Sequence, residues 1–250
     1  MEKKYVASWS GGKDSTFMID ILIKEKKPID EIILCDTGYE HKQLYDYIYK
    51  IKEYWEKLGY KVTILNENKG KDIWHEKMFG KFVRGKKKGQ IRGFPPVFSI
   101  GYCTDYLKVK PFKIYIKENY KNFDVYTYIG LAYNELKRMS KNKKEIYPLI
   151  EKQIDENYIK KWILDKNNFY YNPLYKDFDR LGCFICPKQS LDSLKTIYEK
   201  YPEEWKKIVN LEKKLTELNS PHSKFKRKGT KEIEQKILKN NKAKFNLNEW

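Results

Sequence analysis

Two short stretches of this sequence contain side chains that can do chemistry, and the first is Ser10-Gly-Gly-Lys-Asp-Ser15. Its adjacent glycines allow a ligand to approach the backbone closely, and the N–H groups at the start of a helix favour an anion. Lys13 adds a full positive charge, so the expected ligand is a phosphate. The spacing is not that of the Walker-type loop, in which four residues separate the glycines. The alternative is an ordinary glycine-containing tight turn with a capping serine or aspartate.

The second stretch is Cys183-Phe-Ile-Cys186-Pro187, in which two thiols can reach one metal or cluster from a single turn. The spacing alone leaves three uses open: half of a zinc site, half of an iron–sulfur site, or a redox dithiol of lowered pKa. The chain has four cysteines in 250 residues, which argues against a secreted disulfide scaffold and favours metal or redox chemistry.

The chain carries 52 Lys and Arg against 34 Asp and Glu, a net charge of +18. Such an excess attracts phosphate-containing partners, and two of its most basic stretches are residues 84–92 and 224–228. The excess is mostly lysine and accompanies abundant Tyr, Ile and Asn, a bias that AT-rich coding also produces, so both explanations stay open. The longest apolar runs, such as Ile32–Cys35, have the length of strands, so we expect no membrane contact and a cytoplasmic location.

The elements that must position these residues alternate between strands and helices in the first part of the chain. Apolar runs predict three strands, and apolar residues at helical spacing predict two helices between them. In order, these elements are Lys4–Ser10, Ser15–Lys26, Glu31–Thr37, His41–Leu58 and Lys61–Asn66. The alternation predicts an α/β fold with a parallel sheet and right-handed crossovers, and ligands of such sheets bind outside the carboxyl ends of the strands.

The middle of the chain is less regular. Residues 67–101 show no clear periodicity, and we expect them to form a long functional loop. A helix is expected over Thr104–Asn119, either bent at Pro111 or beginning near it, because proline cannot continue the hydrogen bonding of a helix. A further strand is expected over Asp124–Ala132.

The last hundred residues change in character. The patterns predict an irregular stretch that holds the two cysteines, and helices over Asp155–Asp165, Ser190–Tyr201 and Pro202–Leu218. We therefore expect three parts: a nucleotide-binding α/β domain, a smaller helical region with the Cys183/Cys186 pair, and a basic, partly mobile tail. Their expected bounds are 1–150, 151–218 and 219–250.

Several blocks, taken in order, resemble the phosphoadenosine phosphosulfate reductase family, part of the adenine-nucleotide α-hydrolase or PP-loop ATP pyrophosphatase superfamily. The resemblance runs from about residue 5 to residue 205 and includes the Ser10–Ser15 loop. The other blocks are Asp36-Thr-Gly-Tyr-Glu40, Tyr102-Cys-Thr104 with Leu107, Lys108 and Pro111, Gly130-Leu131 with Glu135 and Arg138, and Arg180–Pro187. The resemblance implies a Rossmann-like parallel sheet flanked by helices, with an adenine nucleotide, ATP or a sulfonucleotide, as ligand.

The resemblance also implies roles for particular residues. The nucleotide phosphates and Mg²⁺ would be held by Ser10, Gly11, Gly12, Lys13, Asp14 and Ser15, and the pocket would be lined by Asp36, Thr37, Gly38 and Gly130. The implied catalytic set is Lys13, Asp14, Lys108, Glu135 and Arg138. From the residues alone, Asp36 suits a ribose hydroxyl, Mg²⁺ or merely a turn, and Glu135 can pair with Arg138 on a short helix.

The same resemblance makes Cys103, Cys183 and Cys186 the implied ligands of a [4Fe–4S] cluster, with Zn²⁺ as the alternative. Adenylyl-sulfate reductases of the family have a Cys-Cys pair where this chain has Tyr102-Cys103, so three of the four ligands are present. A cluster with one iron free of cysteine resembles the cluster that some tRNA thiolation enzymes use to hold sulfide. Cys35 is either a fourth ligand or a core residue.

Three functions follow. The first is an enzyme that activates a substrate with ATP and transfers sulfur to a small or nucleic-acid acceptor, which the basic stretches 84–92 and 224–228 would contact, with an electron- or sulfur-donor protein as partner. The second is a sulfonucleotide reductase that releases sulfite. Phosphoadenosine phosphosulfate reductases use a C-terminal cysteine, and no cysteine follows Cys186. The third is a non-catalytic nucleotide- or nucleic-acid-binding module with structural zinc.

Overall fold

The computed structural model describes residues 1–98 and 101–247, with side chains up to residue 240. Five parallel strands form one sheet in the order β3-β2-β1-β4-β5. The strands are β1 (Lys3–Trp9), β2 (Glu31–Cys35), β3 (Val62–Leu65), β4 (Asp124–Ile129) and β5 (Glu145–Ile146). The α/β, Rossmann-like sheet expected from the sequence is therefore confirmed.

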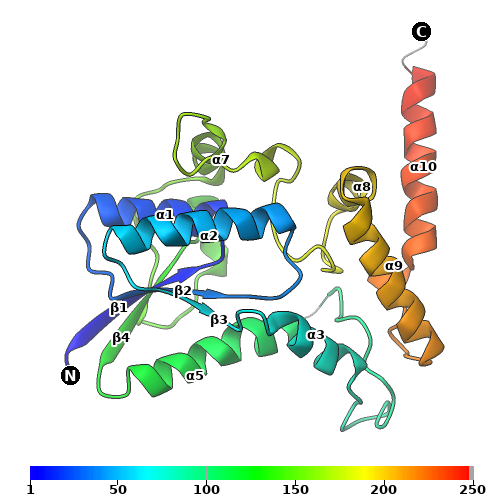
Figure 1. The fold of residues 1–250 in the computed structure, drawn as a ribbon, viewed down its shortest axis with the longest axis horizontal. Helices are drawn as coiled ribbons and strands as arrows, with labels where there is room; N and C mark the ends of the chain where they lie inside the picture. Colours follow the sequence, from blue (N-terminus) through cyan, green and yellow to red (C-terminus); the bar gives the residue numbers. More distant parts are fainter. Residues whose placement is uncertain (99–100, 248–250) are drawn as a thin grey trace.

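The central strands are apolar because helices cover both faces of the sheet. Val6, Ala7 and Trp9 of β1 and Ile32, Ile33 and Leu34 of β2 are buried. Helices α1 (Lys13–Lys24) and α2 (Lys42–Lys57) lie on one face, and α5 (Lys110–Asn119) lies on the other (Figure 1). The order of the strands reverses between β1 and β4, and a ligand crevice is expected at the carboxyl ends of these two strands.

The remaining helices confirm most of the expected elements. Pro111 stands in the first turn of α5, directly after a π-helical turn at Asp105–Val109 that continues from α4. The helices not yet given are α3 (Gly70–Phe79), α4 (Tyr102–Thr104), α6 (Pro148–Glu151), α7 (Glu156–Leu164), α8 (Leu191–Lys200), α9 (Pro202–Glu217) and α10 (Thr230–Leu247). In the part of the chain that the structure describes, no helix is both long and apolar enough to cross a membrane.

One correction concerns residues 67–101, where the sequence predicts only an irregular loop. Helix α3 occupies ten of these residues and buries Trp74 and Met78 against the main core. These two side chains are four positions apart and so lie on one helical face, but the remaining apolar residues do not extend the pattern. The expected strand over Asp124–Ala132 also ends early, at Ile129.

The expected basic tail, residues 219–250, contains a helix in its described part. Helix α10 begins at Thr230, and Ile233 and Ile237 are buried in the main core. The carboxylate of Glu212, on α9, accepts hydrogen bonds from the backbone N–H groups of Phe225 and Thr230 at 2.8–3.1 Å. The segment from Phe225 to Ile237 is therefore held against α9 rather than loose.

The packing of α10 gives a stability prediction. Ile237→Ala removes a side chain that is 1% exposed and should lower the free energy of unfolding by about 2–4 kcal/mol. Leu238→Ala, at the next position but 49% exposed, should change it by less than about 0.5 kcal/mol. Urea unfolding of both variants measures the difference. Equal stabilities would show that α10 does not pack on the core.

Candidate functional site

The Ser10–Ser15 loop connects the carboxyl end of β1 to the start of α1. Gly11 has a φ of +71°, and a Cβ at this position would lie 2.9 Å from the Ile48 side chain on α2. The hydroxyl oxygens of Ser10 and Ser15 are 3.0 Å apart, and the Ser10 N–H donates to Ser15 Oγ at 3.1 Å. The loop is therefore a tight turn that only glycine can make at Gly11, with small hydroxyls drawn together across it.

Glycines also bring the ends of neighbouring strands into close backbone contact with the segments beside them. A Cβ on Gly130, just after β4, would lie 2.5 Å from Ser15 Cα. Gly38, in the turn after β2, has a φ of +77°, and its Cβ would lie 2.1 Å from the Lys71 backbone nitrogen. The expected pocket residues Gly130 and Gly38 are thus at close backbone contacts, where no larger residue fits.

Lys13 does not point into open space. Its Nζ lies 2.7 Å from Glu156 Oε1 and 3.0 Å from both carboxylate oxygens of Asp14, and its side chain is 4% exposed. The backbone N–H of Lys13 donates to the hydroxyl of Tyr175 at 2.6 Å. Lys13 lowers the pKa of Glu156, whereas burial raises that of Asp14. The lysine of the loop is therefore already neutralised by two carboxylates.

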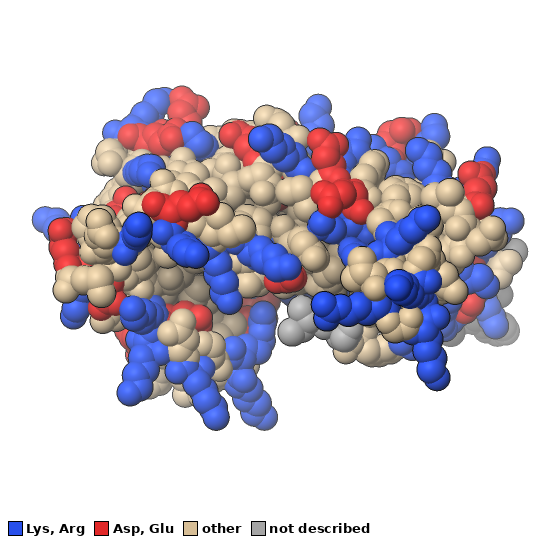
Figure 2. Space-filling model, turned by 90° about the horizontal axis from the view of Figure 1, so that it is seen from below, with Lys and Arg blue, Asp and Glu red and all other residues tan. Residues whose placement is uncertain are grey.

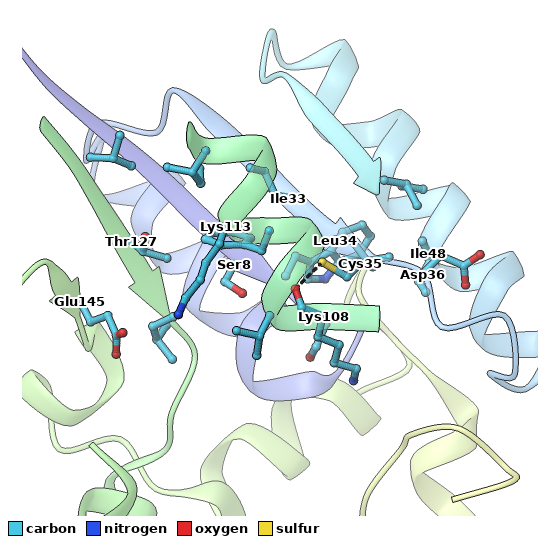
Figure 3. Close-up of a pocket in the computed structure, with 18 of the residues that line it drawn as sticks. Ser8, Ile33, Leu34, Cys35, Asp36, Ile48, Lys108, Lys113, Thr127 and Glu145 are labelled. Atoms are coloured by element: carbon cyan, nitrogen blue, oxygen red, sulfur yellow. Dashed lines mark hydrogen bonds between the residues drawn. The ribbon is translucent and has the colours of Figure 1, made fainter. Parts of the chain in front are cut away.

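A cavity of about 540 Å³ lies between the sheet and α5, beside the loop (Figure 3). Its walls are mostly apolar, with Ile33 on β2 and Phe112 on α5 among them. At the carboxyl ends of the strands it becomes polar, and there it is lined by Ser10, Asp36, Glu40 and Lys108. Its volume and lining suit a nucleotide-sized ligand.

The other predicted residues differ in their relation to this cavity. Asp36 lines it, but its Oδ1 already accepts from the Gly38 N–H at 2.8 Å and the Tyr45 hydroxyl at 2.6 Å, so the turn-forming use is observed. Glu135 and Arg138 are paired with each other on a 3₁₀ turn, and neither lines the cavity. Glu135 is near enough to Asp14 to contribute to raising its pKa.

The Cys183 thiol is connected to the turn after β2. Its Sγ lies 3.0 Å from the hydroxyl of Thr37 and 3.5 Å from Glu40 Oε1, and the Thr37 hydroxyl donates to the same carboxylate oxygen at 2.9 Å. Burial, and then the negative charge of Glu40, raise the pKa of Cys183. Cys35, in the cavity wall, donates to the Lys108 carbonyl at 3.5 Å, and burial raises its pKa to about 11.

Lys108 stands between the cavity and the cysteines. Lys108 is an exposed residue that lines the cavity. Burial acts to lower the pKa of Lys108, but Cys183 and Glu40 outweigh this effect and raise it. Cys103 is also close, and burial and the neighbouring Cys186 raise its pKa. The three predicted ligand cysteines therefore gather in one region, next to a lysine.

The donor atoms of this region are of the kinds that bind metals. Thiols are the donors that iron–sulfur clusters and structural zinc use, so Cys103, Cys183 and Cys186 fit such a group in chemistry. Within residues 1–98 and 101–240, however, no three His, Cys, Asp or Glu side chains are arranged to hold a metal ion. Ligation by all three cysteines would require their side chains to move.

Comparison with known proteins is consistent with this geometry. Residues 4–189 match the phosphoadenosine phosphosulfate reductase domain, a stretch that contains the loop, the cavity and all four cysteines. The chain belongs to this family. The resemblance inferred from the sequence is therefore confirmed, and the family implies a nucleotide-type ligand.

Relatives in the family extend beyond the matched region. Two uncharacterized proteins of Methanocaldococcus jannaschii are 26% and 28% identical to this chain over 87% and 83% of its length, which is 43% and 47% of theirs. An uncharacterized nin region protein of Escherichia phage lambda is 25% identical over 54% of this chain and 50% of its own. The chain thus spans about half the length of the relatives it matches.

Three residues of this candidate site were not predicted from the sequence. Glu156 and Tyr175 reach Lys13 from 143 and 162 positions away, and no local pattern marks either of them as a partner of the loop. Glu40 belongs to the block at residues 36–40 that resembles the family, but the sequence assigned it no role. Its contact with Cys183 depends on two segments that come together only in the folded chain.

The Glu40–Cys183 contact gives a pH prediction. Glu40→Gln removes a negative charge beside the thiol, so the pKa of Cys183 should fall and its thiolate fraction below that pKa should rise, about tenfold for each unit. At pH 8 we expect alkylation of Cys183 by iodoacetamide, followed by mass spectrometry, to become about three- to tenfold faster.

The matched control is Glu53→Gln, an exposed carboxylate on α2 paired with Lys57, which should leave the rate unchanged. A pH profile separates charge from access: the midpoint should move to lower pH, and the rate at high pH should stay the same. An unchanged midpoint would contradict the electrostatic link.

Proposed function

We propose that this chain is an adenine-nucleotide-dependent enzyme of sulfur chemistry, which activates a small or nucleic-acid acceptor with ATP and supports its thiolation. One observation carries this proposal. Glu40 and Lys108 line the cavity and also flank Cys183, so the nucleotide cavity and the cysteines share a wall. A ligand in the cavity would therefore react beside the thiols.

Nucleotide binding would use the start of α1. The N–H groups of its first turn and the charge of Lys13 attract phosphate, and Asp14 and Asp36 are the nearby carboxylates for Mg²⁺. The apolar walls between the sheet and α5 would hold the less polar part of the nucleotide. Family membership supports a nucleotide-type ligand at this place.

The reaction would run in two displacements. An oxygen of the acceptor attacks the α-phosphorus of ATP and displaces pyrophosphate, whose charge Lys13 and Lys108 would stabilise. A sulfur donor at the oxidation level of hydrosulfide then attacks the adenylated carbon, and AMP leaves with the oxygen. When bound at Cys103, Cys183 and Cys186, a cluster with an open iron position would supply a place to hold sulfide. The sulfur, or electrons for the cluster, would come from a donor protein, and a cytoplasmic setting would keep the cysteines reduced.

The reductase alternative is less well supported by the thiols of this chain. It requires a thiolate that attacks the substrate sulfur, and Cys35 is the cysteine that lines the cavity among the described residues. Burial raises the pKa of Cys35 to about 11, so very little of it is thiolate at neutral pH.

Glu135 and Arg138 are proposed only to help position the ligand near Asp14.

Nucleotide affinity gives the first test of the proposal. Because carboxylates already hold Lys13, phosphate must compete with Glu156 for its ammonium group. Lys13→Met should weaken ATP binding about tenfold or more, whereas Glu156→Gln should strengthen it several-fold by removing a competing charge. Calorimetric titration with a non-hydrolysable ATP analogue and Mg²⁺ measures both. Unchanged affinity in Lys13→Met would rule out the loop as the phosphate site.

Metal content gives the second test. Anaerobically purified protein should be brown and contain about four irons and four labile sulfides per chain. Cys183→Ala should lose most of both, and Cys35→Ala should retain them, since Cys35 is not assigned to the cluster. A colourless protein with one zinc per chain would instead support the structural-zinc alternative, and sulfite release from a sulfonucleotide would support the reductase.

A further inference from the structure

Two basic stretches that are far apart in the sequence lie side by side in the fold. The Phe94 N–H donates to the carbonyl of His222 at 2.9 Å, and the Ser220 hydroxyl donates to the carbonyl of Ile91 at 3.2 Å. The Lys87 ammonium lies 2.9 Å from His222 Nε2. Between the two stretches is a cavity of about 290 Å³. We call this surface, formed by residues 84–98 and 220–228, the basic groove.

Most cations of the basic groove have no carboxylate partner among the described residues. Among the described residues, no ion pair with Asp or Glu is made by Arg84, Lys87, Lys88, Lys224, Lys226 or Arg227. By contrast, Lys228, at the end of the second stretch, pairs with Glu232 at 3.5 Å. Figure 2 shows one face of the molecule, where Lys and Arg outnumber Asp and Glu. Crowded like charges repel one another, and a bound anion would relieve this repulsion.

The groove also has an aromatic side chain on its surface. Phe98 is 80% exposed, and the guanidinium of Arg227 lies 4.7 Å from the centre of its ring. An exposed aromatic ring beside several cations is the combination on which unpaired bases stack while phosphates are neutralised. A free phosphate would use the cations but not the ring.

The groove reaches the cysteine region at two points. A Cβ on Gly101 would lie 3.1 Å from the Pro95 side chain, in the groove wall, and 3.0 Å from the Cys103 sulfur. On the other side, the Lys226 ammonium contacts the carbonyl of Gln189, and the Gln189 side chain donates to the carbonyl of Cys183 at 3.2 Å. The groove therefore lies next to the segments that carry the three predicted ligand cysteines.

The loop that presents the cations is held in a costly conformation. Lys226 and Arg227 have φ values of +51° and +67°, which residues with side chains rarely adopt. The carboxylate of Glu212 holds this loop in place by accepting hydrogen bonds from the backbone N–H groups of Phe225 and Thr230. The cations are therefore placed by a built turn and not by a flexible tail.

We propose that the basic groove binds single-stranded nucleic acid, with phosphates on Lys87, Lys224 and Arg227 and an unpaired base on Phe98. The strand would then pass beside the cysteines, as an acceptor of the proposed thiolation must; this last point rests on the proposed function, whereas the binding does not. Single strands are favoured over duplexes because the ring offers a stacking surface.

The test is fluorescence anisotropy of the full chain with labelled 20-nucleotide single strands of RNA and of DNA, over a range of salt concentrations. The variant Lys87→Ala/Lys224→Ala/Arg227→Ala should bind at least one of the strands more than tenfold more weakly than the unaltered chain. Its plot of log affinity against log salt should be shallower by about 2, since three phosphate contacts are lost. Phe98→Ala should weaken binding without changing the slope.

The matched control removes three exposed lysines elsewhere, on or near α1, α2 and α7: Lys27→Ala/Lys57→Ala/Lys161→Ala. It changes the net charge equally and should leave affinity within about twofold. Equal losses in both triple variants, no binding by the unaltered chain, or tighter binding to duplexes, anionic vesicles or polyglutamate would overturn the proposal. ATP-analogue affinity, measured on the same variants, should not change, so a failure of the nucleotide proposal is detected separately.

Discussion

The site depends on close backbone contact at the carboxyl ends of the central strands. Gly130 after β4 touches Ser15 at the start of α1, and Gly38 after β2 touches the start of α3. Because no side chain intervenes, the end of β4 packs directly on the loop after β1, and the turn after β2 packs directly on the start of α3. These loops converge at the carboxyl edge of the sheet, beside the point where the strand order reverses. This convergence sets the end of the cavity, brings Asp36 and Ser10 into one wall, and places the turn that holds Thr37 and Glu40 against Cys183.

Three sites consequently lie in sequence across the molecule. The cavity ends at Glu40 and Lys108, the cysteines follow, and the basic groove lies beyond them. Lys108 is the charge at the junction. A thiolate away from water needs a nearby cation, and the charge of Lys108 acts on Cys183. The charge of Lys108 acts to lower the pKa of Cys183 and of Cys103, but burial has the larger effect and raises both.

The sequence carried more information about the sheet than about the site. Local patterns were enough for β1 to β3, for α1 and α2, and for the glycine loop, because each depends on neighbouring residues. They were not enough for α3 or α10, whose buried faces consist of few side chains. The partners of the loop could not be predicted from local sequence patterns. Glu156 contacts Lys13 only because α7 packs on α1, and the residues around Glu156 in the sequence do not indicate this contact. The contact between the two basic stretches also depends on tertiary packing, so the sequence alone does not predict it.

The partners of Lys13 bear on the proposed phosphate site. A buried ammonium with no partner would be strongly destabilising, and the carboxylates of Asp14 and Glu156 balance the charge of Lys13. Phosphate binding at the proposed site would then exchange one anion for another, and its net free energy would be smaller than the phosphate contact alone suggests. The exchange would also release Glu156, which belongs to α7 and not to the loop. Nucleotide binding would thereby change the contacts of α7, and the chain leads from α7 to the cysteine turn. Lys13 would in this way link the proposed nucleotide site to the cysteines.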